Sequence, residues 1–251
     1  MLWLALAFFV TALVYASVGF GGGSTYSALL ALAGTDYRIL PLLSLACNIL
    51  VVSGSTVRFA KARITPWCGA LTLTALAAPA AFLGGLTPIG QRSFMLLLGS
   101  ALVFTAATLL LPAREVHPQN PSRLAGLMPL AAAPLGYLAG LVGIGGGIFL
   151  APLLHLTRWH DARAIAATTA LFILVNSLFG LAGQLLRGGL DRLAVAVSYG
   201  LPLLLAVVVG GQIGSLLAVR FLPLNWLRWL TALLTGWVGA RLLWDNVRHL
   251  A

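Results

Sequence analysis

Long runs of apolar residues without a single charge restrict what this chain can fold into. Several runs are about 18 to 22 residues long, and roughly 20 apolar residues in a helix cross the hydrocarbon core of a bilayer. Hydrophobic residues make up 60% of the chain and charged residues only 8%, whereas a soluble domain carries about 25% charged residues. So few charges cannot cover a water-soluble globule of this size. The sequence therefore predicts an all-α polytopic membrane protein in the cell membrane.

The apolar runs predict about eight transmembrane helices. The expected spans are residues 2–18, 39–57, 66–86, 93–111, 124–142, 164–186, 193–219 and 224–244, and two shorter apolar pieces, 24–33 and 148–157, each follow a glycine cluster. Residues 2–18 resemble the core of a signal peptide, but no basic residue precedes them. A signal peptide normally opens with a positive region, so we expect this segment to be retained as the first span.

The charged residues exclude several classes of function. Lys and Arg number 15 against 5 Asp and Glu, but they stand singly or in small groups between apolar runs, where cations anchor and orient helices. We therefore expect the lipid bilayer as a partner and no nucleic acid. The 2 cysteines and 4 histidines form no disulfide framework or metal-ligand pattern, so we expect no metal and no cofactor. All five acids lie at span ends or in loops, which argues against a cation exporter.

The two parts of the chain carry the same landmarks in the same order. Val18-Gly19-Phe20-Gly21-Gly22-Gly23 recurs 124 positions later as Val142-Gly143-Ile144-Gly145-Gly146-Gly147. Asp36-x-Arg38 recurs as Asp161-x-Arg163, Gly84-Gly85 as Gly210-Gly211, and Pro88 has a counterpart in Pro223. A slowly drifting offset is expected of a duplicated unit with small insertions. We therefore predict a first four-span repeat (1–111), a linker (112–123) and a second four-span repeat (124–251).

The paired glycine clusters, each at the end of the opening span of a half, resemble those of the TauE/SafE (sulfite exporter) family of membrane transporters. The Asp-x-Arg entry to the next span is similar to the same family, and the resemblance covers essentially the whole chain. It implies a permease that exports, or less readily imports, a small sulfur-containing anion such as sulfite, sulfoacetate, taurine or another sulfonate. Asp36 and Asp161 are most simply N-caps of the following spans, with Arg38 and Arg163 as interface anchors.

Three interpretations of the glycine clusters were compared. A dinucleotide fingerprint lacks its third glycine and its preceding strand. Close helix packing fits the spacing of Gly19 with Gly23 and of Gly143 with Gly147, since each pair forms a GxxxG pattern. The third interpretation is a broken or re-entrant helix, because consecutive glycines have weak helix propensity.

We favour the broken helix. A short helix that restarts at Ser24 and at Ile148 would point its N-terminal N–H groups and positive dipole end into the membrane interior, which makes an anion site. Matched discontinuous helices in two halves indicate the substrate site of a transporter. The distribution of basic residues does not decide between parallel and inverted repeats. We favour inverted repeats, because opposed half-helices then meet at one central site.

The candidate substrate-binding residues combine the glycine clusters with uncharged polar side chains inside the spans. They are Gly19, Gly21, Gly22, Gly23, Ser24, Asn48, Gly143, Gly145, Gly146, Gly147, Thr168, Thr169 and Asn176. Neutral donors suit an oxyanion, although each polar side chain could instead bond two helices together. We expect no catalytic residue, because no nucleophile, histidine or carboxylate constellation lies within the spans.

The open alternatives are a transporter of another small anion and a non-transporting membrane assembly protein. In the second case the glycine clusters would serve packing alone. The surplus of GxxxG spacings is also compatible with a homodimer.

Overall fold

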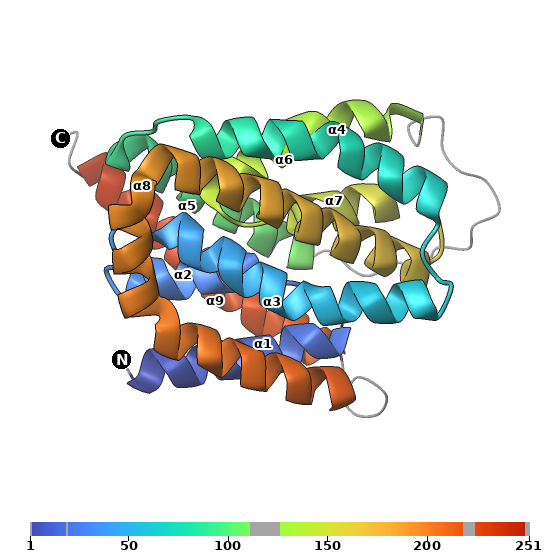
Figure 1. The fold of residues 1–251 in the computed structure, drawn as a ribbon, viewed down its shortest axis with the longest axis horizontal. Helices are drawn as coiled ribbons and strands as arrows, with labels where there is room; N and C mark the ends of the chain where they lie inside the picture. Colours follow the sequence, from blue (N-terminus) through green and yellow to red (C-terminus); the bar gives the residue numbers. More distant parts are fainter. Residues whose placement is uncertain (1, 19, 111–125, 218–223, 249–251) are drawn as a thin grey trace.

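Helices form the whole regular structure that a computed structural model describes for this chain, namely residues 2–18, 20–110, 126–217 and 224–248. They are α1 (Leu2–Val18), α2 (Gly23–Leu32), α3 (Leu40–Lys61), α4 (Trp67–Leu86), α5 (Gln91–Leu110), α6 (Met128–Val142), α7 (Gly147–Leu156), α8 (Ala162–Leu217) and α9 (Leu224–Arg248). They lie side by side in one bundle (Figure 1). The predicted all-α class is confirmed, and the predicted linker, 112–123, lies outside the described residues.

Five helical segments are long and apolar enough to cross a membrane, judged by length and composition. They are Leu40–Lys61, Trp67–Leu86, Gln91–Leu110, Ala162–Gly188 and Ala194–Gly214. α6 and α7 are shorter apolar helices, as is most of α1. The helix positions follow the predicted spans closely, while the total of eight crossings stays a prediction.

α8 differs from the expectation, because the span predicted at 164–186 and the described residues of the span predicted at 193–219 belong to one continuously helical segment, Ala162–Leu217. The backbone stays helical through the polar residues between the two spans, where the sequence predicted one span to end at residue 186 and the next to begin at residue 193. Figure 1 shows that α8 bends sharply and runs back along the bundle. We call residues 162–188 the first arm of α8 and residues 194–217 its second arm.

Glycines bring α6 into backbone contact with α4. A Cβ atom on Gly136 would overlap the carbonyl oxygen of Ala77, and a Cβ on Gly140 would overlap that of Ala81. Only glycine allows helices to approach so closely. The residue numbers rise together along the two helices, so α6 and α4 run parallel.

The second arm of α8 packs on α1 in the same way. A Cβ on Gly210 would overlap the carbonyl oxygen of Phe9, and a Cβ on Gly214 would overlap that of Leu13. These two helices are also parallel, because the residue numbers again rise together. The two contacts correspond to each other in the predicted repeats. α6, the opening helix of the second half, packs on α4 of the first half, and α1, the opening helix of the first half, packs on the second arm of α8 in the second half.

The opening helices α1 and α6 run in opposite directions. α3 is parallel to the second arm, since Gly200 faces Leu43 and Gly211 faces Val51, and so α1, α3 and the second arm share one direction. α4 follows α3 through a tight turn and returns the other way (Figure 1). α6 is parallel to α4 and therefore opposes α1.

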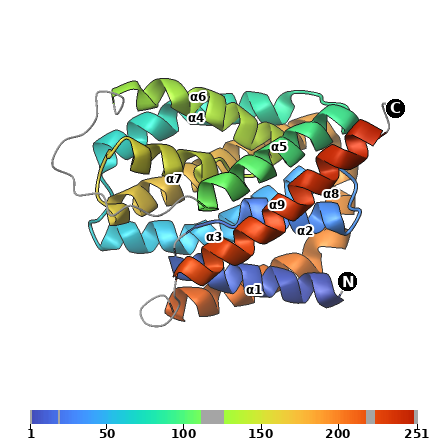
Figure 2. The same ribbon diagram turned by 180° about the vertical axis from the view of Figure 1, so that it is seen from behind.

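α5 and α9 complete the bundle on the face seen in Figure 2, where α9 crosses beside α5. The pair is antiparallel and glycine-mediated. A Cβ on Gly99 would lie 3.1 Å from the carbonyl oxygen of Gly239 and 3.0 Å from Leu243, and Gly236 faces Ala106.

Candidate functional site

Both glycine clusters interrupt a helix, as predicted. α1 ends at Val18 and α2 begins at Gly23, while α6 ends at Val142 and α7 begins at Gly147. Both short helices thus begin one residue earlier than predicted. Gly19, one of the candidate site residues, lies outside the described residues.

Left-handed backbone explains why these positions are glycine. Gly22 and Gly146 are the residues that precede α2 and α7, and each has a φ of 78°. Gly143 and Gly145 have a φ of 84°. Side chains rarely tolerate this conformation, whereas glycine adopts it freely. The Cβ positions of three of these glycines face residues outside the two loops: Gly143 faces Pro41, Gly146 faces Phe172 and Gly22 faces Tyr15. These glycines therefore shape the loops.

The N-termini of α2 and α7 point into the middle of the bundle. The first backbone bond at the start of α2 runs from the Tyr26 N–H to the Gly22 carbonyl at 3.0 Å, and α7 starts with bonds from Phe149 and Leu150 to the Gly146 carbonyl at 3.1 Å. The N–H groups before these have no acceptor inside their own helix, and they carry the positive end of the helix dipole. Such an arrangement can bind an anion.

The two glycine loops meet at Asn48 in the middle of α3. A Cβ on Gly21 would lie 2.5 Å from Asn48 Oδ1, a Cβ on Gly145 would lie 2.6 Å from Asn48 Nδ2, and a Cβ on Gly23 would overlap the same amide. Asn48 is fully buried, and its Nδ2 donates a hydrogen bond to the Ile144 carbonyl at 3.1 Å. One side chain of the first half thus holds the loop of the second half.

Ile173 lies opposite Asn48 and was missed in the sequence. A Cβ on Gly21 or on Gly145 would lie 3.1 Å from Ile173 Cγ2, and a Cβ on Gly147 would overlap the Ile173 side chain. The offset of 125 residues that relates Asp36 to Asp161 also relates Asn48 to Ile173. That offset could have identified Ile173, but an isoleucine in an apolar span carries no chemical signal of its own.

Buried polar atoms without hydrogen-bond partners gather around the two loops. Within the described residues they include the hydroxyls of Ser24, Thr168, Thr169 and Ser177, Asn48 Oδ1 and both amide atoms of Asn176, with further examples at Tyr26 on α2, Thr56 on α3 and Thr105 on α5. A Cβ on Gly145 would lie 3.1 Å from the Ser177 hydroxyl, and one on Gly147 would lie 2.8 Å from Thr169 Cγ2. Native proteins satisfy nearly all buried polar groups, so this cluster indicates a place where a polar ligand binds.

The structure therefore brings most of the candidate residues together. The candidate residues that contact one another, or that share a contact with Ile173, are Gly21, Gly23, Asn48, Gly145, Gly147 and Thr169. Ser24 and Thr168 are fully or almost fully buried and adjoin Gly23 and Thr169 in sequence, and Asn176 is fully buried and adjoins Ser177. Ser177, which is not among the predicted site residues, joins the cluster through its buried hydroxyl, which has no partner among the described residues.

Replacement of Asn176 separates a binding role from a structural one. Asn176→Leu removes two unsatisfied buried polar atoms and keeps the number and branching of side-chain heavy atoms, so the free energy of unfolding is expected to stay equal or to rise by about 1 kcal/mol. Transport is expected to fall about 10-fold if the amide binds the substrate. Thr105→Val, a matched change at a buried unpartnered hydroxyl on α5, is expected to leave transport unchanged. Normal flux in Asn176→Leu would remove Asn176 from the site.

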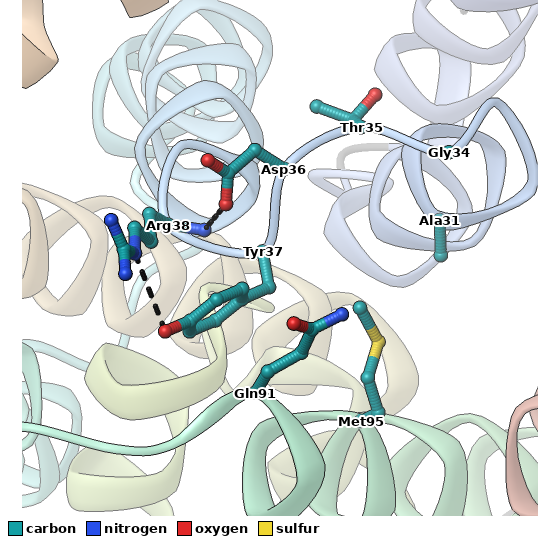
Figure 3. Close-up of a pocket in the computed structure, with 8 residues that line it drawn as sticks. All are labelled: Ala31, Gly34, Thr35, Asp36, Tyr37, Arg38, Gln91 and Met95. Atoms are coloured by element: carbon teal, nitrogen blue, oxygen red, sulfur yellow. Dashed lines mark hydrogen bonds between the residues drawn. The ribbon is translucent and has the colours of Figure 1, made fainter. Parts of the chain in front are cut away.

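A separate cavity of about 400 Å³ lies between α2, the segment that joins α2 to α3, and the start of α5, lined by Ala31, Gly34, Thr35, Asp36, Tyr37, Arg38, Gln91 and Met95 (Figure 3). Arg38 Nε donates to the Tyr37 hydroxyl at 3.3 Å, and this bond is the main reason that the pKa of Arg38 is raised above its ordinary value. None of the glycine loops lines this cavity, so we do not assign it to the candidate site.

The two aspartates of the Asp-x-Arg pairs differ in role. Asp161 immediately precedes α8, and its Oδ1 accepts from the Ala164 N–H at 2.7 Å, which confirms the predicted N-cap. The N-cap prediction was wrong for Asp36, because Ile39 is the residue that precedes α3. Asp36 Oδ1 accepts from the Arg38 N–H at 2.9 Å, and so it stabilises the turn before the helix instead.

Comparison with known proteins identifies the family of this chain. The model of the sulfite exporter TauE/SafE family matches residues 4–242. The chain belongs to the sulfite exporter TauE/SafE family. It is 36% identical to the "Probable membrane transporter protein y4hK" of Sinorhizobium fredii over 96% of this chain and 97% of that protein.

More distant relatives of the TauE/SafE chain carry the same description. The "Probable membrane transporter protein YunE" of Bacillus subtilis is 22% identical over 79% of this chain and 81% of its own. A "Probable membrane transporter protein" of Methanocaldococcus jannaschii is 23% identical over 87% of this chain and 88% of its own. No solved structure matches the chain. The chain is thus a multi-pass membrane protein and a membrane transporter.

Proposed function

We propose that this TauE/SafE protein exports a small sulfur-containing anion such as sulfite, sulfoacetate, taurine or another sulfonate. The observation that carries the proposal is the convergence of two helix N-termini on a cluster of buried, unpartnered neutral polar groups at Asn48. Helix N-termini and neutral donors bind oxyanions without a fixed positive side chain. The sulfur chemistry comes from the family, whose description names a sulfite exporter.

The repeats of this transporter are inverted in our proposal. α1 and α6 run in opposite directions, and each is followed by a glycine break and a short helix. The N-termini of α2 and α7 then approach the centre from opposite sides, as expected when substrate binds between inverted repeats. Transport would proceed by alternating access around the two breaks, with one half rocking against the other and no covalent chemistry.

The direction of transport follows from the membrane potential. Each negative charge that leaves a negative-inside cell gains about 2.3 kcal/mol per 100 mV. Efflux of an anion therefore needs no coupled ion. This supports export over import for a substrate with net negative charge.

Flux into proteoliposomes tests the proposal. Radiolabelled sulfite and sulfoacetate are expected to move with an imposed membrane potential, and taurine, which is a zwitterion, with its own concentration gradient. Empty liposomes and a folded Gly22→Leu/Gly146→Leu double variant serve as controls, and the variant is expected to be inactive.

The same assay distinguishes the alternatives. Movement of only sulfate, phosphate or carboxylates would keep the anion site and replace the sulfur substrate. No flux of any anion would favour the non-transporting assembly protein, with the glycine loops serving packing alone.

A further inference from the structure

The amide of Asn48 has a fixed orientation. Its Nδ2 donates to the Ile144 carbonyl at 3.1 Å, and the opposite orientation would place two acceptor oxygens against each other. Asn48 Oδ1 is therefore directed away from Ile144 and toward the Gly21 loop, where a Cβ would lie 2.5 Å from it. The oxygen is buried and has no hydrogen-bond partner in the described part of the chain.

This oxygen is a fixed acceptor in a site whose other groups can suit an anion. The second unpartnered amide, Asn176, has neither atom bonded to a residue that the structure describes, so it can present its Nδ2 instead of its oxygen. The N–H groups at the starts of α2 and α7 are donors, and hydroxyls such as that of Ser177 can act as donors too. An oxyanion without a proton would satisfy these donors but would leave Asn48 Oδ1 unsatisfied and facing another acceptor. A substrate that carries both a negative group and a hydrogen-bond donor satisfies the whole site.

We propose that Asn48 selects substrates that carry their own hydrogen-bond donor, an inference that rests on the proposed function. The favoured species are a protonated oxyanion such as hydrogensulfite and a sulfonate with an ammonium or hydroxyl group. The fully deprotonated oxyanion and the plain alkyl sulfonate are disfavoured, and so is sulfoacetate among the proposed substrates, because its ionised carboxylate only accepts hydrogen bonds. Asn48 is thus a specificity-determining residue.

Ile173, on the first arm of α8, takes no part in this selection. Ile173 occupies the position equivalent to Asn48 across the loops, at 3.1 Å from the Cβ positions of both Gly21 and Gly145. Its side chain neither donates nor accepts a hydrogen bond. The donor of the substrate therefore lies on the α3 side, next to Asn48, and Ile173 itself can contact only an apolar part of the substrate.

Three sulfonates with the same headgroup and a two-carbon chain test the proposal. Taurine ends in an ammonium group, 2-hydroxyethanesulfonate in a hydroxyl and ethanesulfonate in a methyl group. Each is supplied as a concentration gradient to proteoliposomes held at zero membrane potential. Taurine and 2-hydroxyethanesulfonate are expected to move about 10- to 100-fold faster than ethanesulfonate, the range for a buried acceptor left unsatisfied.

Two variants locate the preference. Asn48→Leu has the same number of side-chain heavy atoms but lacks both the acceptor and the bond to Ile144. Its flux is expected to fall overall, while the three sulfonates are expected to move at rates comparable to one another. Ile173→Leu keeps the acceptor and is expected to retain the preference. Both variants are compared at equal amounts of folded protein. The measurement on the unmodified protein needs neither variant.

Sulfite provides a second measurement. At fixed total sulfite, the initial rate is expected to rise as the pH is lowered through the neutral range, because hydrogensulfite replaces the dianion. The rate for 2-hydroxyethanesulfonate is expected to stay constant over the same range and serves as the control.

The outcomes separate this inference from the proposed function. Equal rates for ethanesulfonate and 2-hydroxyethanesulfonate in the unmodified protein would overturn the role of Asn48 and leave the sulfonate transporter intact. A strict need for sodium without any preference among the three would also overturn it, because the oxygen would then coordinate a coupled cation. No movement of any sulfonate or of sulfite would overturn both proposals.

Discussion

Gly145→Ala is expected to reduce transport at least about 10-fold while the protein remains folded. Gly145 has a φ of 84°, and an added Cβ would lie 2.6 Å from Asn48 Nδ2 and 3.1 Å from the Ser177 hydroxyl. A left-handed conformation costs a residue with a Cβ roughly 1–2 kcal/mol. Relief of both conflicts would move the loop and with it the N-terminus of α7. Flux per folded molecule in proteoliposomes measures the effect.

Gly54→Ala is the matched control for this change. Gly54 lies on α3, the helix of Asn48, and no atom lies within 4 Å of its Cβ position. Flux is expected to stay unchanged, and the free energy of unfolding is expected to rise by up to about 1 kcal/mol, because alanine favours helix over glycine. Full activity in Gly145→Ala would show that the loop does not have to hold its position beside Asn48.

The sequence predicted the helix breaks because their cause is local. Three successive glycines weaken a helix wherever they stand, and the same run occurs at Gly21 to Gly23 and at Gly145 to Gly147. Apolar runs bounded by polar residues likewise placed most helix ends within a few residues. Asn48 could be proposed because a neutral polar residue in an apolar span stands out.

The remaining features depend on contacts between residues far apart in the chain. The direction of α6 relative to α1 follows from which glycines meet which carbonyl groups, such as Gly140 with Ala81 and Gly214 with Leu13. Charge counts carry no such information. The Asn48 bond to the Ile144 carbonyl joins residues 96 positions apart. Ile173 looks like any other core residue until its place opposite Asn48 is known.

The position at which the following helix begins explains why the N-cap prediction was wrong at Asp36. The sequence Asp-x-Arg occurs at both sites, but a turn of three residues separates Asp36 from the start of α3, whereas α8 begins directly after Asp161. The aspartate side chain bonds the nearest free N–H groups in both cases. Where the helix begins decides whether that bond is an N-cap.

Replacement of a glycine that packs two helices together, rather than one that shapes a loop, has the second large expected effect, and this effect is on stability. Gly140→Ala is expected to lower the free energy of unfolding by about 1–3 kcal/mol or more, the range for overpacked cores. Its Cβ would overlap the Ala81 carbonyl oxygen of α4, and the Gly140 carbonyl accepts a hydrogen bond from Gln184 Nε2 of the first arm of α8 at 3.1 Å. Three helices must therefore separate to admit one methyl group. Thermal unfolding in detergent measures the loss, again with Gly54→Ala as the control.

Flux per folded molecule then distinguishes packing from binding. Gly140 lies on α6 before the glycine break and does not face Asn48, so the folded fraction of Gly140→Ala is expected to keep most of its transport. Gly145→Ala is expected to show the opposite pattern, with a modest loss of stability and a large loss of flux. If both variants lost stability and flux in the same proportion, the glycine loops would serve packing alone. Opposite patterns would instead support the convergence of the two loops at Asn48 as the place where the transported anion binds.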